Sequence, residues 1–471
     1  MEVIHISAEC YPVAKVGGLG DVVGALPKYQ QQGGHIAKVL MPFYRRPFMA
    51  ENEFELVHEG GMWIGNDWHH FNVIKEKTNK LGFDLYILQI PGLLEQQNVY
   101  GEWNDAERFT AFQIAALDWI NSWQHKPDII HCHDHQTGLI PFMMIQCFKY
   151  RALKNIPTVF TIHNAQYQGQ MGWDRMHWLP SFDNWKSGMM DWNHQINPMA
   201  AGIKNSWHVT TVSPGYLQEL MNSANGLDPL FRQEAGKCSG ILNGIDTSVW
   251  NPATDSMLTT HYNLRNVISG KKKNKQDLCE VFHLDTQKPL FSFIGRLVDD
   301  KGADLLPEAI LRAANEMQHQ ANFLVLGNGR GEIEGALEHI KAYLDGEYNT
   351  YIGYNEKLSH LIYAGSDFLL MPSRVEPCGL NQLYALKYGT MPIVRSVGGL
   401  KDTVIDIGDP GGYGIRFIQP SIGDICHSIG RAVELYQDTK KLNDLRRYMM
   451  KLDFSWDKSS QQYLDLYHTL K

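Results

Sequence analysis

Nine short runs of apolar, largely β-branched and aromatic residues recur along the 471-residue chain, with segments of helical length between them. Five of these runs lie in the first half of the chain and four in the second. They are residues 2–7, 35–42, 128–133, 157–163 and 208–213, then 289–295, 322–327, 367–373 and 391–396. Runs of this kind, buried on both faces and spaced by helices, are typical of parallel sheets built from strand-helix-strand units. The pattern therefore predicts an α/β fold with two parallel sheets.

The two groups of runs are separated by a turn-rich segment, residues 238–252, with the sequence CSGILNGIDTSVWNP. At roughly 150 residues per domain, a chain of this length corresponds to about three domains or two large ones. We therefore expect one α/β domain over residues 1–245 and a second over residues 246–450. The tail reads as helix, and residues 451–471 are expected to form a C-terminal helix that packs back on the first domain.

The lysine-rich segment 271–277, with the sequence KKKNKQD, has two interpretations. It is either an interaction patch or the solvated face of a helix. Because it begins an amphipathic stretch, the pattern favours a solvated helix face.

The overall charge and the cysteines limit the classes of function. The net charge is −8, from 43 basic and 51 acidic side chains, which argues against nucleic acid or an anionic membrane surface as the main partner. Seven cysteines without a CxxC pair indicate neither a disulfide framework nor a cysteine zinc site. The start of the chain, with Glu2, lacks the basic character of a signal peptide, and no apolar run is long enough to span a membrane. These features predict a cytoplasmic protein.

A glycine-rich loop follows the first run. It contains Lys15, Gly17, Gly18 and Gly20, and a helix is expected to begin near Asp21. Glycine allows close approach of the backbone and positive φ, and a helix N-terminus presents free N–H groups, so this loop suits a phosphate group. The alternative is a tight turn without a ligand, since the spacing matches neither the GxGxxG motif nor the P-loop.

Histidines gather at the end of the third run. His131, His133 and His135 would share one face of a strand, and Asp134 would point to the other. The spacing matches no recognised metal motif, so we interpret Asp134 and its neighbours as hydrogen-bonding groups rather than metal ligands. His163, which follows the next run, is either another such group or a structural histidine.

In the second half, Arg296 and Lys301 lie five residues apart in the loop after a predicted strand. Two cations on one loop suit a diphosphate, because arginine offers a bidentate fork and lysine a point charge. The alternative is a surface salt bridge to Asp299 or Asp300.

A later loop carries Arg374 and Glu376, and Gly379 stands where the next helix begins. The Glu376 carboxylate either caps this helix or accepts hydrogen bonds from sugar hydroxyls. Tyr354, just after another predicted strand, either stacks on a base or is an ordinary aromatic residue at the rim of a site.

Taken together, these segments resemble bacterial glycogen synthases and plant starch synthases, the retaining glycosyltransferases of family 5. The resemblance covers essentially the whole chain. The segments that carry it are KVGGLGDVVGALPK, HCHDHQTGLIP, TIHNAQYQG, VTTVSPGY, NGIDTSVWNP, GRLVDDKG and PSRVEPCGLNQLYALKYGTMPIVRSVGGLKDTV. It implies a GT-B fold, with two Rossmann-like doubly wound domains facing a central cleft and C-terminal helices crossing back to the first domain.

The resemblance also implies the reaction. Glucose would pass from ADP-glucose to the non-reducing end of an α-1,4-glucan, such as glycogen or a maltooligosaccharide, with retention of the α configuration. Cationic side chains and helix dipoles would act on the phosphates, so neither a metal ion nor a cofactor is expected. No nucleic acid or membrane partner is expected either.

Individual residues take implied roles by the same resemblance. Arg296 and Lys301 are similar to the family's diphosphate clamp, which would stabilise charge on the departing ADP. His163 resembles the histidine beside the transferred glucose, and Glu376 resembles the carboxylate that holds its hydroxyls. The other implied donor contacts are Lys15, Gly17, Gly18, Asn243, Tyr354 (stacked on adenine), Gly379 and Leu380. Candidate sugar or acceptor contacts are Glu9, Asp134 and Asn164.

Three positions depart from common patterns. His135 and Gln136 stand where many relatives carry tryptophan with histidine or serine, and Tyr384 stands where many other retaining GT-B enzymes have a second glutamate. Residues 171–194, rich in Trp and Met, either cover the acceptor groove or are buried under the sheet.

Two other functions remain open alternatives. One is a GT-B glucosyltransferase that uses UDP-glucose, and the other is a non-catalytic glucan-binding relative. Against the second, the five residues with the most specific implied roles are all present: Lys15, His163, Arg296, Lys301 and Glu376.

Overall fold

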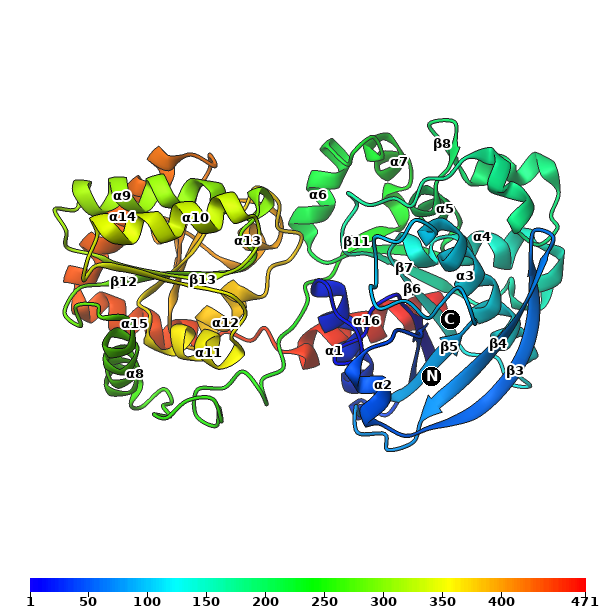
Figure 1. The fold of residues 1–471 in the computed structure, drawn as a ribbon, viewed down its shortest axis with the longest axis horizontal. Helices are drawn as coiled ribbons and strands as arrows, with labels where there is room; N and C mark the ends of the chain where they lie inside the picture. Colours follow the sequence, from blue (N-terminus) through cyan, green and yellow to red (C-terminus); the bar gives the residue numbers. More distant parts are fainter. The chain divides into compact units, whose positions relative to one another are not determined.

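The computed structural model describes residues 1–471, and the chain divides into two compact units. The first unit comprises Met1–Ile241 together with Trp456–Lys471, and the second comprises Leu242–Ser455. The boundaries expected from the sequence are 245/246 and 450/451. Each unit is built on a largely parallel sheet with packed helices, which confirms the predicted α/β class (Figure 1). No helix combines the length and the apolar character needed to cross a membrane.

The first unit contains a nine-stranded sheet in the order β11-β10-β7-β6-β1-β2-β5-β4-β3. Its strands are β1 (Glu2–Ile6), β2 (Ile36–Pro42), β3 (Phe54–Ile64), β4 (Asp67–Glu76), β5 (Asp84–Gln89), β6 (Ile129–His133), β7 (Thr158–Ile162), β10 (His208–Thr211) and β11 (Cys238–Gly240). The five runs predicted as strands in this half are β1, β2, β6, β7 and β10. They form the parallel part of the sheet together with β5 and β11.

Strands β3 and β4 were not predicted from the sequence, and they form an antiparallel hairpin at one edge of the sheet. Much of β3 is exposed, and its Trp63 packs edge-on against Trp68 of β4 at the surface. A strand with one solvated face lacks the continuous apolar run that marks a strand buried on both faces.

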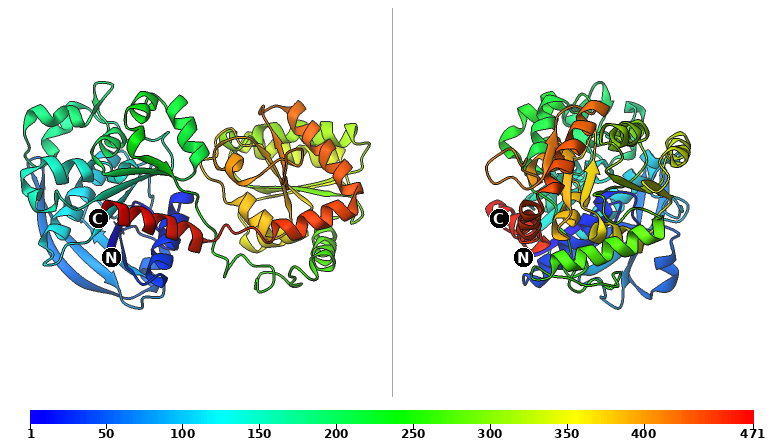
Figure 2. Two further views of the ribbon diagram at one scale, coloured as in Figure 1. Left: turned by 180° about the vertical axis from the view of Figure 1, so that it is seen from behind. Right: turned by 90° about the vertical axis from the view of Figure 1, so that its left-hand side faces the viewer.

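The helices of the first unit include the C-terminal segment of the chain. They are α1 (Gly18–Gln32), α2 (Pro47–Glu51), α3 (Asp105–Ser122), α4 (Leu139–Gln146), α5 (Pro198–Asn205), α6 (Pro214–Asn222), α7 (Asp228–Gln233) and α16 (Trp456–Leu470). Helix α16 lies beside α1 (Figure 2), and its Trp456, Tyr463 and Tyr467 join one apolar cluster with Val22 and Leu26 of α1. The last helix is therefore a core element of the first unit.

The Trp- and Met-rich insert 171–194 is not buried under the sheet. It forms two 3₁₀ turns, Trp173–Trp178 and Asn184–Met189, and most of its residues are exposed or half-buried. Trp185 is 75% exposed, whereas Met190 is fully buried and anchors the segment. Of the two interpretations from the sequence, burial under the sheet is wrong.

The second unit contains a six-stranded parallel sheet in the order β14-β13-β12-β15-β16-β17. Its strands are β12 (Leu290–Ile294), β13 (Asn322–Gly327), β14 (Tyr348–Ile352), β15 (Phe368–Met371), β16 (Met391–Arg395) and β17 (Ile415–Phe417). Its helices are α8 (Val267–Phe282), α9 (Leu306–Glu316), α10 (Gly331–His339), α11 (Glu356–Gly365), α12 (Asn381–Lys387), α13 (Gly398–Thr403), α14 (Ile422–Gln437) and α15 (Thr439–Met449). Figure 1 shows α9, α10 and α14 over one face of this sheet and α8, α11 and α12 over the other.

The lysine-rich segment is only in part a solvated helix face. Lys272 and Lys273 are exposed on α8, but Lys271 and Lys275 are buried. The Lys271 ammonium donates to carbonyl oxygens and to Thr390 Oγ1, at 2.7–3.3 Å. Lys271 and Lys275 lie one turn apart on α8, so they share its inward face, where buried acceptors satisfy their charge.

Candidate functional site

In the first unit, the predicted site residues follow three neighbouring strands. Strand β1 pairs with β6, and β6 pairs with β7, all in parallel register. Their carboxyl ends therefore open at the same edge of the sheet, where ligands bind in folds of this type. The residues in these loops are Glu9, Lys15, Gly17 and Gly18 after β1, Asp134 after β6, and His163 and Asn164 after β7.

The Glu9 carboxylate organises the glycine-rich loop. It is 2% exposed, and its Oε2 accepts hydrogen bonds from the backbone N–H of Val16 (2.6 Å) and of Gly17 (3.1 Å). Its Oε1 accepts from the Tyr100 hydroxyl at 2.7 Å. Burial raises the pKa of the Glu9 carboxyl, and these three donors oppose the rise. Glu9 therefore occupies two loop amides that an anion would otherwise bind.

The glycines of this loop leave open space beside their α-carbons, and they do not adopt positive φ angles. Gly17 has an extended conformation with φ −141°, so the predicted use of positive φ is wrong at this residue. A Cβ atom on Gly17 or Gly18 would meet no atom within 4 Å, whereas one on Gly20 would lie 3.1 Å from the Lys15 side chain. The first residues of α1 therefore present their backbone to open space, as close approach by a ligand requires.

Lys15 forms an ion pair across the same loop. Its ammonium lies 2.6 Å from Asp21 Oδ1, and its side chain is 43% exposed. Burial raises the pKa of the Asp21 carboxyl, and the Lys15 charge opposes that rise. The ion pair holds Lys15 beside the N-terminus of α1 and leaves it accessible.

Asp134 joins the ends of β6 and β7. Its backbone has φ 56°, in the left-handed region, which ends the strand at His133. Its Oδ1 accepts hydrogen bonds from the backbone N–H of His163 (2.7 Å) and of Asn164 (3.4 Å). Burial raises the pKa of the Asp134 carboxyl to about 7 despite these donors. Asp134 therefore positions the backbone at His163. The Asn164 side chain is used within its own loop, where its Oδ1 accepts a hydrogen bond from the N–H of Gln166.

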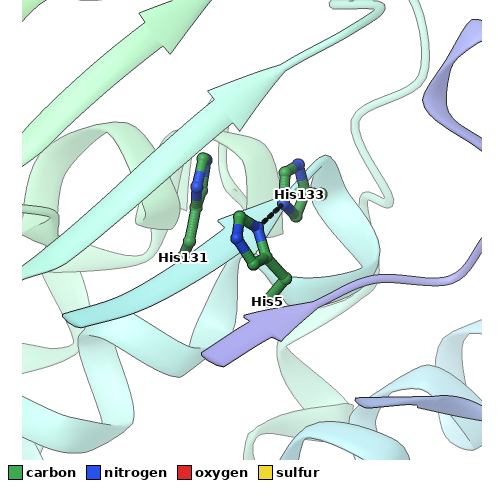
Figure 3. Close-up of side chains that lie close together, drawn as sticks. All are labelled: His5, His131 and His133. Carbon is green, nitrogen blue, oxygen red and sulfur yellow. Dashed lines mark hydrogen bonds between the residues drawn. The ribbon is translucent and has the colours of Figure 1, made fainter. Parts of the chain in front are cut away.

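Histidines from β1 and β6 form a buried cluster beneath this edge of the sheet. His5, His131 and His133 are fully buried, and Figure 3 shows the His5 and His133 rings joined by a hydrogen bond, with the His131 ring beside them. His133 also contacts His163, with its Nδ1 at 3.1 Å from His163 Nε2. His135 lies in a separate 3₁₀ turn, His135–Thr137. The expectation that it shares a strand face with His131 and His133 is wrong, because the strand ends at His133.

In the second unit, Lys301 and Glu376 form one cluster. Lys301 follows β12 and Glu376 follows β15, and these strands are neighbours in the sheet. The Lys301 ammonium lies 2.7 Å from Oε1 and 2.6 Å from Oε2 of Glu376, and Ser373 Oγ donates to Oε2 at 3.0 Å. Glu376 is 6% exposed. The carboxylate is thus held in one orientation by a cation and a hydroxyl.

Arg296 is exposed in the loop after β12 and makes no salt bridge to Asp299 or Asp300. Asp299 pairs instead with Arg330. The neighbouring Arg374 is committed to structure, since its guanidinium binds the carboxylate of Asp304. Arg296 is therefore the cation of this loop that keeps its charge available to solvent.

The loop after Glu376 packs closely on the start of α13. A Cβ on Gly398 would lie 2.1 Å from the Glu376 carbonyl oxygen, and one on Gly399 would lie 2.1 Å from that of Cys378. Gly379 has φ 75°, so glycine is required there as well. Leu380 is the N-cap residue of α12. The two glycines therefore let the first turn of α13 pack directly against the backbone at Glu376 and Cys378.

Two further predicted residues differ in their exposure. Asn243 is 5% exposed, and its Oδ1 is buried without a hydrogen-bond partner. Tyr354 follows β14 and is 82% exposed. An orphaned buried acceptor and an exposed aromatic ring are both groups that a polar, flat ligand can satisfy.

The groups that hold the site residues in place were not predicted from the sequence. They are Ser373 beside Glu376, the glycines Gly398 and Gly399, and the buried partners of His163. Two adjacent glycines shortly after a predicted strand were a signal in the sequence for close backbone packing at that point. The histidine partners gave none, because His5 and His133 are 128 residues apart in the sequence.

Comparisons with known proteins cover the whole chain. Residues 2–233 match the family described as starch synthase catalytic domain, and residues 274–449 match glycosyl transferases group 1. The chain is 54% identical over 470 residues to a glycogen synthase of Flavobacterium johnsoniae, covering 100% of this chain and 99% of that protein. It is 37% identical over 483 residues to a glycogen synthase of Streptococcus agalactiae, covering 100% of both.

Solved structures agree with these relatives. The catalytic domain of starch synthase IV from Arabidopsis thaliana, bound to ADP and acarbose, superimposes with a TM-score of 0.88 at 32% identity, covering 100% of this chain and 99% of that one. Sucrose-phosphate synthase from Thermosynechococcus elongatus has a TM-score of 0.65 at 18% identity, with coverage of 100% and 98%. This second likeness concerns the fold alone.

Proposed function

This chain belongs to the family of glycogen synthases and starch synthases and is a glycosyltransferase, and on that premise we propose that it extends an α-1,4-glucan with glucose from ADP-glucose. The glucose is added at the non-reducing end with retention of the α configuration. The observation that carries the proposal is the Lys301, Glu376 and Ser373 cluster at the carboxyl ends of β12 and β15. The ADP in the solved starch synthase supports the choice of nucleotide.

The second unit supplies the cations that we assign to the diphosphate. Arg296 is exposed and free of the nearby aspartates, and a guanidinium can grip phosphate oxygens with two parallel hydrogen bonds. Lys301 uses its ammonium on both oxygens of Glu376, but an ammonium has three donors. Together they stabilise the negative charge that develops on ADP as the bond to glucose breaks.

Glu376 is assigned to the glucose hydroxyls. An ionised carboxylate has about four acceptor positions, and the two Lys301 contacts and the Ser373 hydroxyl use three of them. The remaining capacity suits a sugar hydroxyl. Because the carboxylate is already oriented, it costs little reorganisation when the substrate binds.

The remaining donor contacts are assigned by the same reasoning. In the first unit, Lys15 and the open space beside the Gly17 and Gly18 α-carbons are assigned to the nucleotide sugar, while Glu9 holds the Gly17 N–H. In the second, the orphaned Asn243 Oδ1 and the exposed Tyr354 ring are assigned to its polar and flat parts. Gly379 and Leu380 lie where α12 begins, and we place them near the phosphates.

Glucose transfer and sugar contacts in the first unit complete the proposal. His163, which directly follows β7, is assigned to a position beside the transferred glucose. Glu9, Asp134 and Asn164 are assigned as sugar or acceptor contacts. Each of them already accepts a backbone hydrogen bond, so these contacts would use their remaining acceptor capacity.

The test is turnover with each nucleotide sugar, with glycogen and a maltooligosaccharide as acceptors. ADP-glucose should support elongation, and UDP-glucose should support much less. Strict dependence on UDP-glucose would overturn the donor assignment. Glucan binding without turnover of either donor would establish a non-catalytic glucan-binding protein instead.

A further inference from the structure

The buried histidines of the first unit form one continuous hydrogen-bonded chain that ends at His163. Gln30 of α1 lies at its start, with Oε1 at 2.8 Å from His5 Nε2. His5 Nδ1 lies 3.1 Å from His133 Nε2, and His133 Nδ1 lies 3.1 Å from His163 Nε2. Gln30, His5 and His133 are each at most 1% exposed, so water does not compete for these groups.

A second series of hydrogen bonds begins at the other polar atom of the Gln30 side chain, the amide nitrogen Nε2. The Gln30 Nε2 donates to the Tyr467 hydroxyl of α16 at 3.2 Å, and this hydroxyl lies 2.7 Å from His131 Nδ1. His131 Nε2 lies 2.5 Å from Thr161 Oγ1, which lies 2.5 Å from Thr210 Oγ1. In this arrangement the Tyr467 hydroxyl accepts from the Gln30 amide nitrogen, and the Gln30 amide oxygen faces His5.

The direction of every hydrogen bond in the first series follows from this amide. A neutral imidazole has one N–H donor and one acceptor nitrogen. Because Gln30 Oε1 can only accept, His5 must carry its proton on Nε2, and its Nδ1 then accepts from His133. His133 therefore also carries its proton on Nε2, and its Nδ1 accepts from His163.

The rings are neutral, as this logic requires. Burial lowers the pKa of His5 to about 4 and of His163 to about 3, and it lowers the pKa of His131 and His133 well below the ordinary value of 6.5. The Tyr467 hydroxyl, the Gln30 amide and the two threonine hydroxyls that face these rings are uncharged at neutral pH.

The same cluster does not present a metal site. Three of its nitrogens lie within 4.8 Å of one another, but the His131 and His133 rings are stacked with centroids 4.2 Å apart. Stacked rings do not aim their lone pairs at a common point, and both nitrogens of all three rings are used in hydrogen bonds.

We infer that Gln30 is a positioning residue that, through His5 and His133, holds His163 as the Nε2–H tautomer with Nδ1 as an unprotonated acceptor. His163 is thereby prepared to accept, and not to donate, a hydrogen bond at Nδ1. The consequence for catalysis rests on the proposed function, in which His163 lies beside the transferred glucose. A sugar hydroxyl is then the donor that this nitrogen suits.

The first experiment reads the tautomer directly in the full-length protein. Nitrogen-15 spectra of imidazole-labelled protein distinguish protonated from unprotonated nitrogens, and a His163→Ala variant identifies the His163 signals. The expected result is a neutral His163 with the proton on Nε2. A proton on Nδ1, or a doubly protonated ring at neutral pH, would overturn the inference. This measurement does not depend on turnover, so it separates this inference from the proposed function.

The second experiment removes the group that sets the direction. Gln30→Met keeps the size of the side chain but has no amide, and we expect the Nε2–H tautomer of His163 to be lost. The kcat should fall on the order of tenfold, as loss of one hydrogen bond predicts, with a smaller change in the donor KM.

Thr161→Val is the matched control. It is isosteric and equally buried, and it breaks the second series at His131 without touching the chain to His163. We expect its kcat to stay within about twofold of the native value. A Gln30→Met protein with the native tautomer and kcat contradicts the inference, and if that variant does not fold, the native spectrum alone decides.

Discussion

Glu376 illustrates how one residue depends on its neighbours. Its carboxylate is buried, and without Lys301 and Ser373 it would be an uncompensated charge in the interior. The pairing fixes the orientation of the carboxylate, which a sequence motif does not specify.

We predict that Glu376→Gln and Glu376→Ala lower kcat by on the order of 10² or more, with a smaller change in the donor KM, because the carboxylate acts mainly at the transition state. Steady-state kinetics with ADP-glucose and glycogen measures both constants. Glu332→Ala, which removes an exposed carboxylate of the same unit, is the control and should change neither. Near-native turnover of the Glu376 variants would show that this carboxylate does not hold the sugar.

For Lys15, we predict that Lys15→Ala weakens ADP-glucose affinity on the order of tenfold, because a charged hydrogen bond to phosphate is lost. Folding should be unaffected, since the exposed ion pair with Asp21 contributes little to stability. Calorimetric titration measures the affinity. Lys77→Ala is the control, because Lys77 directly follows β4 and its side chain is about as exposed as that of Lys15. Unchanged binding of the Lys15 variant would remove it from the donor site.

At the scale of elements, a buried ionic cluster joins α8, α15 and the start of β15. Asp367 is fully buried and accepts from Lys275 of α8 at 2.7 Å, from Arg446 of α15, and from the backbone of Leu290 at 2.9 Å. Burial alone would raise the pKa of Asp367, but the Lys275 and Arg446 charges hold it below its ordinary value. Two helices and a strand are thereby tied to one carboxylate.

We predict that Asp367→Asn destabilises the second unit by about 3 kcal/mol, because it leaves two buried cations without a counter-charge. Native-state hydrogen exchange of the β12 and β15 amides measures this loss in the full chain. Asp277→Asn is the control, since it breaks an i,i+4 pair on the exposed face of α8, worth about 0.5 kcal/mol or less. Equal effects of the two substitutions would refute the role of the cluster.

The C-terminal helix shows what elements add to local pattern. The helical tail was predicted from the sequence. That α16 completes the core of the first unit, however, depends on its packing against α1. Its Tyr467 reaches the hydrogen-bonded network that ends at His163. A surface helix in isolation would carry no such contact.

At the scale of the whole molecule, the buried histidines make stability depend on pH. The folded-state pKa values of His5 and His163 are about 4 and 3, below the ordinary 6.5, so the unfolded chain binds more protons between these values. Stability is therefore complete above about pH 6.5 and is lost as the pH falls, by about 1.4 kcal/mol per pH unit for each such histidine. Asp134 acts in the opposite sense, because its pKa is raised to about 7.

We predict that the unfolding temperature falls as the pH is lowered from 7 to 5, because the four depressed histidines outnumber the three carboxyls with raised pKa values, Glu9, Asp21 and Asp134. Asp134→Asn removes one of the opposing groups, so the decline should be steeper in that variant. Calorimetry in non-reacting buffers at fixed ionic strength measures both slopes. A flat profile in the native protein would contradict the neutral state assigned to the histidines.

Much of the fold could be predicted because it rests on local pattern. All nine apolar runs are strands, and the polar residues that follow them lie at carboxyl ends of strands. The hairpin β3–β4 and the burial of Lys271 could not be predicted in this way. Both features depend on which face of the strand or helix packs against the rest of its unit, and local sequence does not specify that face.

The sequence by itself determined the order of strands and helices, the family, and the candidate residues, because hydrophobic period and short motifs are local. The roles of those residues in the reaction stay predictions. Only the tertiary structure decided which polar groups pair: Glu9 with loop amides, Lys301 with Glu376, and His163 with a chain that begins at Gln30. The physical reason is that strand order and register bring together groups from separate parts of the chain, 75 residues apart for Lys301 and Glu376 and 128 for His5 and His133. Burial then makes their hydrogen bonds obligatory.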